Sequence, residues 1–268
     1  MAKKKIIISI FVGIIAILGL DAFVIEPSMI EVNEIDISNT GTKMKIGFIS
    51  DFQRQNSDPV FVQRVVDMLN EERLDTIVIG GDFIDKSLGE LPSLDPLQKL
   101  DTKYGVYGVL GNHDYDVYSL NRNNADFEMG ESVIRYLESR GPIQILRNEN
   151  IVVNDVVLIG LDSYWAGLRD IDKAFENTSD EFKILLTHNQ NNLEINKETA
   201  DVYLFGHTHC GQVRLPYVGS IPKIIGFEGE YDYKHYIVND ADVYTTCGLT
   251  PGPRFFNPPE ITIINLLE

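Results

Sequence analysis

The clearest signal of the architecture is the stretch Gly80-Gly81-Asp82-Phe83-Ile84-Asp85, which continues the apolar, strand-like run Thr76–Gly80. Asp82 and Asp85 therefore come just after a predicted strand. In α/β sheets, binding sites form outside the carboxyl ends of the strands. The glycine before Asp82 suits a tight turn in which the backbone approaches a ligand closely. The stretch predicts an α/β sheet with a carboxylate-bearing site at its edge.

Four further apolar runs end in polar side chains of related kinds. They are Lys45–Ser50 before Asp51, Val106–Leu110 before Gly111-Asn112-His113-Asp114, Lys183–Thr187 before His188, and Val202–Phe205 before Gly206-His207-Thr208-His209. The chain has only five histidines, and four of them lie in these clusters. Asp, Asn and His together form an oxygen and nitrogen donor set that suits Mn, Fe, Zn or Mg better than a thiolate site. We interpret the clusters as one metal site.

The rest of the pattern indicates a layered α/β protein with two sheets. Helices are predicted at Pro59–Glu72, with proline in its first turn, and at Asp126–Arg140, which is followed by Gly141-Pro142. Strands are predicted before and after the clusters at residues 30–35, 151–153, 156–161, 236–238, 243–246 and 261–267. Strands that alternate with helices and end in a strand-rich tail favour this arrangement over a purely β or purely helical fold.

Three of the clusters resemble the signature blocks of the calcineurin-like metallophosphoesterases, in the family's order. These are Gly80–Asp85, Gly111–Asp114 and Gly206–His209. The later stretches 211–216 and 254–261 are similar to the bacterial exported or membrane-anchored branch. The resemblance extends over residues 26–268. It implies a four-layer α/β/β/α sandwich of two mixed sheets, preceded here by an N-terminal membrane helix.

The resemblance also implies a role for each residue in the clusters. Asp51, Asp82 and His209 would hold a first divalent ion, and Asp82 would bridge to a second ion held with Asn112, His188 and His207. Two ions about 3.5–4 Å apart clamp a phosphoryl group and supply a hydroxide for in-line attack. His113 would protonate the leaving oxygen, oriented by Asp85. General-acid help of this kind is worth about 10²–10⁴ in rate.

Two positions depart from the family pattern. The first block is normally Asp-x-His, but Gln53 takes the place of its histidine. Gln53 could bind the first ion through its amide oxygen or orient a water, and an oxygen donor would favour Mn, Mg or Ca over Zn. The second departure is Cys210, where the branch usually has glycine. It could be a ligand thiol, a small residue in a turn, or the disulfide partner of Cys247.

Three arginines are candidates for contact with the anionic oxygens of a substrate, because a guanidinium fork matches phosphate geometry. They are Arg54, Arg214 and Arg254. The polar segment Tyr115–Met129 and the stretch Asp162–Trp165 could form the rim of a pocket. Core packing is the alternative explanation for Trp165.

The N-terminus predicts a membrane attachment. Lys3, Lys4 and Lys5 precede the uncharged run Ile6–Leu20, and we expect residues 1–25 to form a signal anchor rather than a cleaved signal. Residues 26–44 would then be a juxtamembrane connector with a strand, and residues 45–268 the catalytic domain. The lysines would remain in the cytoplasm, which leaves the domain outside the cell membrane, or secreted if the signal is cleaved.

These observations predict an enzyme that hydrolyses phosphodiester or diphosphate bonds by metal-activated hydroxide, on a lipid-linked or cell-wall substrate. The alternatives are a phosphomonoesterase or cyclic-nucleotide hydrolase on the same centre, and a non-catalytic binding protein with a degenerate site. The net charge of -17 argues against nucleic acid as a partner, since nucleic-acid binders usually carry a basic surface.

Overall fold

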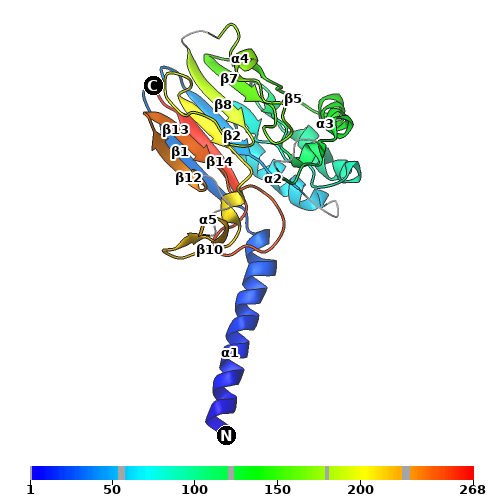
Figure 1. Cartoon of the computed structure of the whole chain (residues 1–268), viewed down its shortest axis with the longest axis vertical. Coiled ribbons are helices and arrows are strands. Elements are labelled where there is room, and N and C mark those ends of the chain that lie inside the picture. The colour runs from blue at the N-terminus through cyan, green and yellow to red at the C-terminus, as the bar shows by residue number, and fades with distance from the viewer. Residues whose placement is uncertain (1, 54–57, 120–123, 179–180, 225–229) are drawn as a thin grey trace.

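The computed structural model describes residues 2–53, 58–119, 124–178, 181–224 and 230–268, and Arg54 lies outside these ranges. Two six-stranded mixed sheets form the body of the protein (Figure 1). The first contains, in spatial order, β1 (Glu31–Ile37), β14 (Glu260–Leu266), β2 (Met44–Ile49), β3 (Thr76–Ile79), β4 (Val106–Gly108) and β5 (Ile143–Ile145). The second contains β12 (Lys234–Val238), β13 (Ala241–Thr245), β9 (Val202–Phe205), β8 (Phe182–Thr187), β7 (Val156–Leu161) and β6 (Glu149–Val153).

The strands that precede the polar clusters are parallel to one another within each sheet. In the first sheet β2, β3, β4 and β5 run parallel, and in the second β7, β8, β9 and β13 do. Because parallel strands end at the same edge, the residues that follow them gather there. β14 and β6 run antiparallel to their neighbours β2 and β7, so both sheets are mixed, as predicted.

Three hydrophobic clusters separate four layers. The middle one lies between the two sheets and includes Phe48, Leu204 and Tyr244. A second packs the first sheet against α2 (Pro59–Glu71), the 3-10 segment η3 (Leu88–Lys99) and α3 (Phe127–Arg140). The third covers the outer face of the second sheet, where the only helix among the contributing described residues is the short α4 (Ile171–Ala174). The predicted sandwich is confirmed, with one outer layer much thinner than the other.

Both predicted helices form, for local reasons. The Asp58 side chain accepts a hydrogen bond from the Phe61 backbone N–H at the start of α2, and Asp126 caps α3 through the Met129 backbone N–H in the same way. The apolar side of each helix then packs on the first sheet. The sequence patterns did not predict β5, nor the two-residue strands β10 (Arg214–Leu215) and β11 (Gly219–Ser220), which are too short to carry a pattern.

The N-terminal helix α1 (Ala2–Leu20) projects away from the two sheets (Figure 1). It continues through η1 (Asp21–Ile25) and η2 (Glu26–Ser28), and residues 3–28 are long and apolar enough to cross a membrane. β1, inside the predicted connector, pairs in parallel with β14 and is the edge strand of the first sheet. The segment between α1 and residue 44 therefore belongs to the sheet as well as linking it to the helix.

Candidate metal centre

Loops at the carboxyl ends of five strands bring the predicted ligands together. Asp51 follows β2, Asp82 follows β3, Asn112 follows β4, His188 follows β8, and His207 and His209 follow β9. Asp51, Asp82, Asn112 and His188 are completely buried. Buried charges are stable only when they are paired or coordinate a metal, so this burial already points to an ion-binding cluster.

The side chains form two groups suited to a metal ion, and the groups share one carboxylate. The first contains Asp51, Asp82 and His209, and the second contains Asp82, His188 and His207. Within each group the ligand atoms lie within 4.8 Å of one another. His209 Nε2 is 3.2 Å from Asp51 Oδ1, and His188 Nε2 is 3.1 Å from Asp82 Oδ2. Asp82 is therefore in position to bridge two ions.

The donor atoms are oriented as metal ligands require. His188 Nδ1 lies 2.7 Å from the Gly80 carbonyl oxygen, which fixes the ring and leaves Nε2 directed into the site. Among the described residues, buried Nε2 has no hydrogen-bond partner. Asn112 donates its amide N–H to the Val117 carbonyl at 2.6 Å, so its amide oxygen is the atom that can bind a cation; the contact of that oxygen with the Asn189 amide nitrogen is long, at 3.5 Å. Both residues fit a bound cation.

The loops reach this geometry through an unusual backbone. Asp51, Gln53, Asp82, His207 and His209 all have left-handed backbone conformations, with φ between 36° and 71°. Such conformations are uncommon outside glycine and cluster at functional sites. Glycine is required beside them: a Cβ at Gly111 would lie 2.0 Å from Asp82 Oδ1, and one at Gly206 would lie 2.8 Å from Asp51 Oδ2.

His113 lies at the edge of the site, next to Asp85. The His113 Nδ1 and Asp85 Oδ1 atoms are 2.8 Å apart, and His113 Nε2 is 4.0 Å from Asp82 Oδ2. The carboxylate fixes the ring, which directs Nε2 towards the ligand groups. Tyr118 supports this pair, because its hydroxyl donates to the Asp85 carbonyl and its ring packs edge-on against His113. The sequence patterns did not single out Tyr118.

The charges in the site favour ionised Asp51 and Asp82 and a positive charge next to them. Burial favours the neutral forms of Asp51 and Asp82, but the neighbouring histidines outweigh it and lower the pKa of both carboxyl groups. Burial also favours neutral His188, yet the carboxylates of Asp82 and Asp51 raise its pKa to about 9. Burial and the charge of His188 lower the pKa of His207 to about 3. Without metal, a proton on His188 occupies the place of a cation.

Metal binding should therefore release a proton and strengthen with pH. An ion that takes His188 Nε2 must displace its proton, so the apparent affinity should rise about tenfold per pH unit up to about pH 9. The raised pKa of His188 also means that its protonation stabilises the metal-free fold. This stabilisation is complete below about pH 6.5, the ordinary pKa of histidine, and should be lost as the pH rises to about 9. Calorimetric titration of the apoprotein with Mn²⁺ in buffers of different ionisation enthalpy measures the proton release; pH-independent affinity would contradict it.

Gln53 is oriented differently from either role considered for it. Its amide nitrogen lies 2.5 Å from Asp82 Oδ2, and its amide oxygen lies 3.1 Å from the Thr250 hydroxyl. The Thr250 hydroxyl also donates to the Asp51 carbonyl at 2.8 Å. In this arrangement Gln53 holds the shared carboxylate rather than presenting an oxygen to the first group.

The structure gives Arg254 a structural role. Arg254 is completely buried, and its guanidinium nitrogens donate to backbone carbonyls of Cys247, Gly248, Thr250 and Asn257. The substrate contact expected of Arg254 is wrong, because these bonds commit its donors to holding the chain between β13 and β14.

Arg214 is mostly buried and contacts a backbone carbonyl, a carboxylate and an aromatic ring. Its guanidinium donates to the Cys210 carbonyl at 3.0 Å and to the Asp232 carboxylate at 3.2 Å, and it lies over the Tyr233 ring. A substrate contact at Arg214 stays a prediction.

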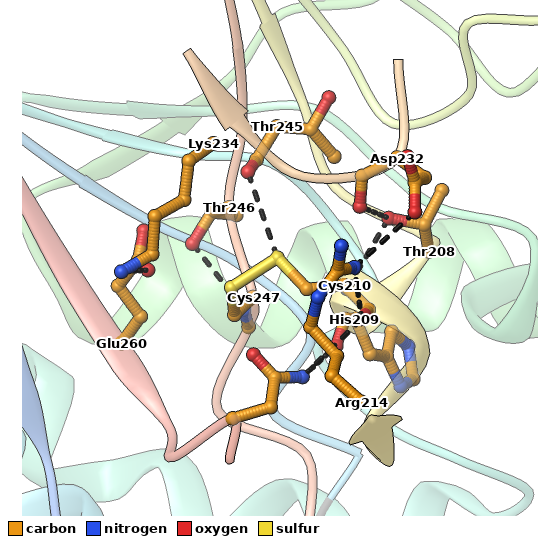
Figure 2. The surroundings of a disulfide bond; sticks show 12 residues. Thr208, His209, Cys210, Arg214, Asp232, Lys234, Thr245, Thr246, Cys247 and Glu260 are labelled. Atoms are coloured by element: carbon orange, nitrogen blue, oxygen red, sulfur yellow. Dashed lines mark hydrogen bonds and ion pairs between the residues drawn. A yellow bond between two sulfur atoms is a disulfide. The ribbon is translucent and has the colours of Figure 1, made fainter. Parts of the chain in front are cut away.

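A disulfide joins Cys210 to Cys247 and lies directly behind a metal-site loop (Figure 2). It connects η6 (His209–Gly211) to the segment after β13. The pairing answers the question that the sequence left open, and it rules out a ligand thiol. Thr208 caps η6 by accepting from the Cys210 backbone N–H. The disulfide thus secures the position of His209.

Reducing the disulfide should destabilise the protein. The bond spans a sequence separation of 37 residues, and loop-closure entropy for that length corresponds to roughly 4 kcal/mol of unfolding free energy. Urea unfolding of the detergent-solubilised chain, with and without reductant, measures the difference. The double variant Cys210→Ser/Cys247→Ser is the control: it should match the reduced protein and be insensitive to reductant. Equal stability in both redox states would contradict the expectation.

Two further side chains shape the centre. Asp114, the last residue of its block, accepts from the backbone N–H groups of Phe83, Ile84 and Gly111 and so ties two ligand loops together. Burial and the charge of Asp82 raise the pKa of Asp114 to about 7. Trp165 packs edge-on against His207, with ring centroids 4.7 Å apart, and against the hydrophobic cluster between the first sheet and helices α2 and α3. This packing supports the core interpretation of Trp165, and a place on the rim of a pocket stays a prediction.

Comparison with known proteins agrees with this geometry. An uncharacterized metallophosphoesterase of Helicobacter pylori is 31% identical over 217 residues, which are 77% of this chain and 55% of that protein. The phosphodiesterase YaeI of Escherichia coli is 29% identical, covering 83% of this chain and 82% of YaeI. The UDP-2,3-diacylglucosamine pyrophosphatase LpxG of Chlamydia muridarum is 26% identical, covering 84% of each chain.

The chain spans about half the length of the Helicobacter relatives it matches. A family model described as calcineurin-like phosphoesterase matches residues 44–211, more than half of the chain. That range contains all the strand-end clusters that carried the resemblance. The chain therefore belongs to the calcineurin-like phosphoesterases.

Proposed function

We propose that the protein is a metal-dependent phosphoesterase that hydrolyses phosphodiester or diphosphate bonds at a dinuclear centre. The observation that carries the proposal is the shared position of Asp82, which lies in both ligand groups. A single carboxylate between two sets of donors is what two adjacent ions need. The donor set of carboxylate, amide and imidazole suits Mn, Fe, Zn or Mg, and we propose Mn²⁺ as the first ion to test.

The residues divide the work. When bound, the ions polarise the phosphoryl group and activate water as the nucleophile. Asp51, Asn112, His188, His207 and His209 would hold them, together with Asp82, which belongs to both ligand groups. His113 Nε2 carries the proton for the leaving oxygen, and Asp85 keeps that nitrogen directed at the site by binding Nδ1. The rings of Tyr118 and Trp165 pack edge-on against His113 and His207 and so support the positions of these imidazoles.

The proposed substrate is a lipid-linked or other cell-envelope phosphoester, reached from the outer side of the cell membrane. Helix α1 supports attachment, and Lys3, Lys4 and Lys5 before it favour a cytoplasmic N-terminus. The disulfide supports an oxidising compartment for the domain. The names of YaeI and LpxG, a phosphodiesterase and a pyrophosphatase acting on a lipid-bearing sugar nucleotide, point to the same bond types.

The test is hydrolysis by the full chain in detergent, after removal of metal and readdition of single divalent ions. Bis(p-nitrophenyl) phosphate and p-nitrophenyl phosphate separate a phosphodiesterase from a phosphomonoesterase, and a cyclic nucleotide separates the third possibility. We expect Mn²⁺-dependent cleavage of the diester in preference to the monoester. No turnover with any ion of the panel would support a non-catalytic binding protein instead.

We further propose that Gln53 reverses its amide when an ion is present. The Thr250 hydroxyl has one proton, and the Asp51 carbonyl at 2.8 Å takes it. The Thr250 oxygen can then accept from the Gln53 amide nitrogen, which turns the Gln53 amide oxygen towards Asp82 and the first ion. Which end of an amide is oxygen and which is nitrogen is inferred from the groups around it. A cation beside Asp82 would favour the orientation in which the Gln53 oxygen faces the ion.

Replacing Gln53 should change which ion the first group prefers. Gln53→His supplies an imidazole and should raise Zn²⁺ affinity relative to Mn²⁺ by roughly 10- to 100-fold, a typical range for changes around a metal site. Gln53→Leu, which removes the amide, should weaken binding of one ion of either kind. Competition with a fluorescent chelator gives both affinities. Unchanged affinities in Gln53→Leu would show that Gln53 is not a ligand.

A further inference from the structure

An unusual apolar surface lies beside the end of the N-terminal helix. It is formed by the hairpin of β10 and β11, the following short helix α5 (Ile221–Ile224), and one residue of the loop before β14. Its exposed apolar side chains are Leu215, Tyr217, Val218, Ile221, Ile224 and Phe256. Tyr217 is fully exposed, and the others have exposed fractions from 40% to 62%. Contiguous exposed apolar surface of this kind marks an interaction site.

Backbone contacts fix this surface to the helix. The Arg254 backbone N–H donates to the Ala22 carbonyl at 2.8 Å, and the Glu26 carboxylate accepts from the backbone N–H groups of Phe256 and Asn257. On its other side the same loop joins the hairpin, since the Arg214 backbone N–H donates to the Phe255 carbonyl at 2.9 Å. Figure 1 shows β10 and α5 next to the point where α1 meets the domain.

The composition of the surface matches the boundary of a lipid bilayer. Residues 213–224 contain no acidic residue, in a chain with a net charge of -17, and their two basic residues pair with the buried Asp232, so little uncompensated charge opposes contact with lipid. Tyr217 at the tip of the hairpin has the amphipathic ring that prefers membrane interfaces. Phe23, Val24 and Ile25 are exposed between Ala22 and Glu26, the two residues that bond the loop carrying Phe256. The apolar side chains of the helix and the hairpin therefore face the same surroundings.

We propose that this hairpin surface, residues 213–224 with Phe256, lies in the bilayer interface beside the point where α1 leaves the membrane. The inference rests on α1 being the membrane span that the proposed function assumes. It adds a second contact, so the domain stands on the membrane in a fixed orientation instead of moving freely on its helix. Asn257 donates to the His209 carbonyl at 2.8 Å, so one residue connects this contact to the metal centre. The centre thus stays close to phosphoesters of membrane lipids.

Three valines of nearly equal exposure allow a matched test. Val12 lies in α1, Val218 in the hairpin and Val152 on β6, with exposed fractions of 58%, 62% and 60%. β7, the partner of β6, lies at the end of the domain away from α1 (Figure 1). Each is changed singly to cysteine in the full chain and labelled with an environment-sensitive dye. The native cysteines are paired and do not react. The proteins are then placed in phosphatidylglycerol/phosphatidylcholine nanodiscs with or without acyl-chain-brominated lipids.

We expect a blue-shifted emission and quenching by brominated lipids at Val12→Cys and Val218→Cys, and neither at Val152→Cys. Quenching at Val12→Cys alone would overturn the hairpin contact and leave the proposed function standing. No quenching at Val12→Cys would overturn the membrane attachment on which both rest, whereas quenching at all three would reject a specific surface. Unchanged diester hydrolysis in detergent shows that each labelled variant is folded.

Discussion

Asp82→Asn should slow turnover severely while leaving the protein folded. Asparagine keeps the volume and can still accept the His113 backbone N–H, which lies 2.9 Å from Asp82 Oδ1. It lacks the second anionic oxygen that would join the two groups of ligands. A metal ion is worth several kcal/mol of transition-state stabilisation, so the rate should fall roughly 10³-fold or more. Steady-state hydrolysis and metal analysis by mass spectrometry measure both effects, and the metal content should drop to one ion or none.

A second buried carboxylate provides the control for this variant. Asp162 accepts from the Tyr115 hydroxyl at 2.8 Å and from the Arg147 guanidinium at 2.9 Å, and it belongs to neither ligand group. Asp162→Asn should therefore lose some stability but keep its metal content and most of its activity. Two ions bound to active Asp82→Asn would show that the bridge lies elsewhere.

The metal centre could be predicted because each ligand directly follows a strand. The local pattern predicts the strand, and the convergence of parallel strand ends then places Asp51 beside Asp82 in the first sheet. The packing of the second sheet on the first brings His188 to them. The glycines belong to the same local signal: Gly111 and Gly206 stand where a Cβ would collide with the carboxylates of Asp82 and Asp51. Each glycine directly precedes a predicted ligand, Asn112 or His207, so the motif is visible in the sequence although the carboxylate it accommodates comes from another loop.

Features that depend on distant partners could not be predicted in this way. The orientation of Gln53 depends on Thr250, which is 197 residues away in the chain. Arg254 has the chemistry of a phosphate contact, and only the convergence of four backbone carbonyls on it reveals a structural role. The Cys210–Cys247 pairing likewise depends on where β13 ends relative to η6. In each case, tertiary contacts select between roles that one residue type can fill.

The effect of replacing His113 should depend on the leaving group. His113→Gln removes the imidazole proton but keeps the backbone N–H that donates to Asp82, so metal content should be unchanged. For a diester with a poorly acidic alkyl alcohol as leaving group, turnover should fall about 10²–10⁴-fold. For bis(p-nitrophenyl) phosphate the loss should be much smaller, because p-nitrophenolate leaves without a proton.

Asp85→Asn gives the matched test of the orienting contact. It keeps a side-chain oxygen in the place of Asp85 Oδ1, which lies 2.8 Å from His113 Nδ1, but removes the negative charge of the contact that orients the ring. The same dependence on the leaving group should therefore appear with a smaller amplitude. If both variants slowed the two substrates equally, the pair would be acting on substrate binding or on the arrangement of the loops. Proton donation by Nε2 requires that the difference grow as the leaving group becomes a stronger base.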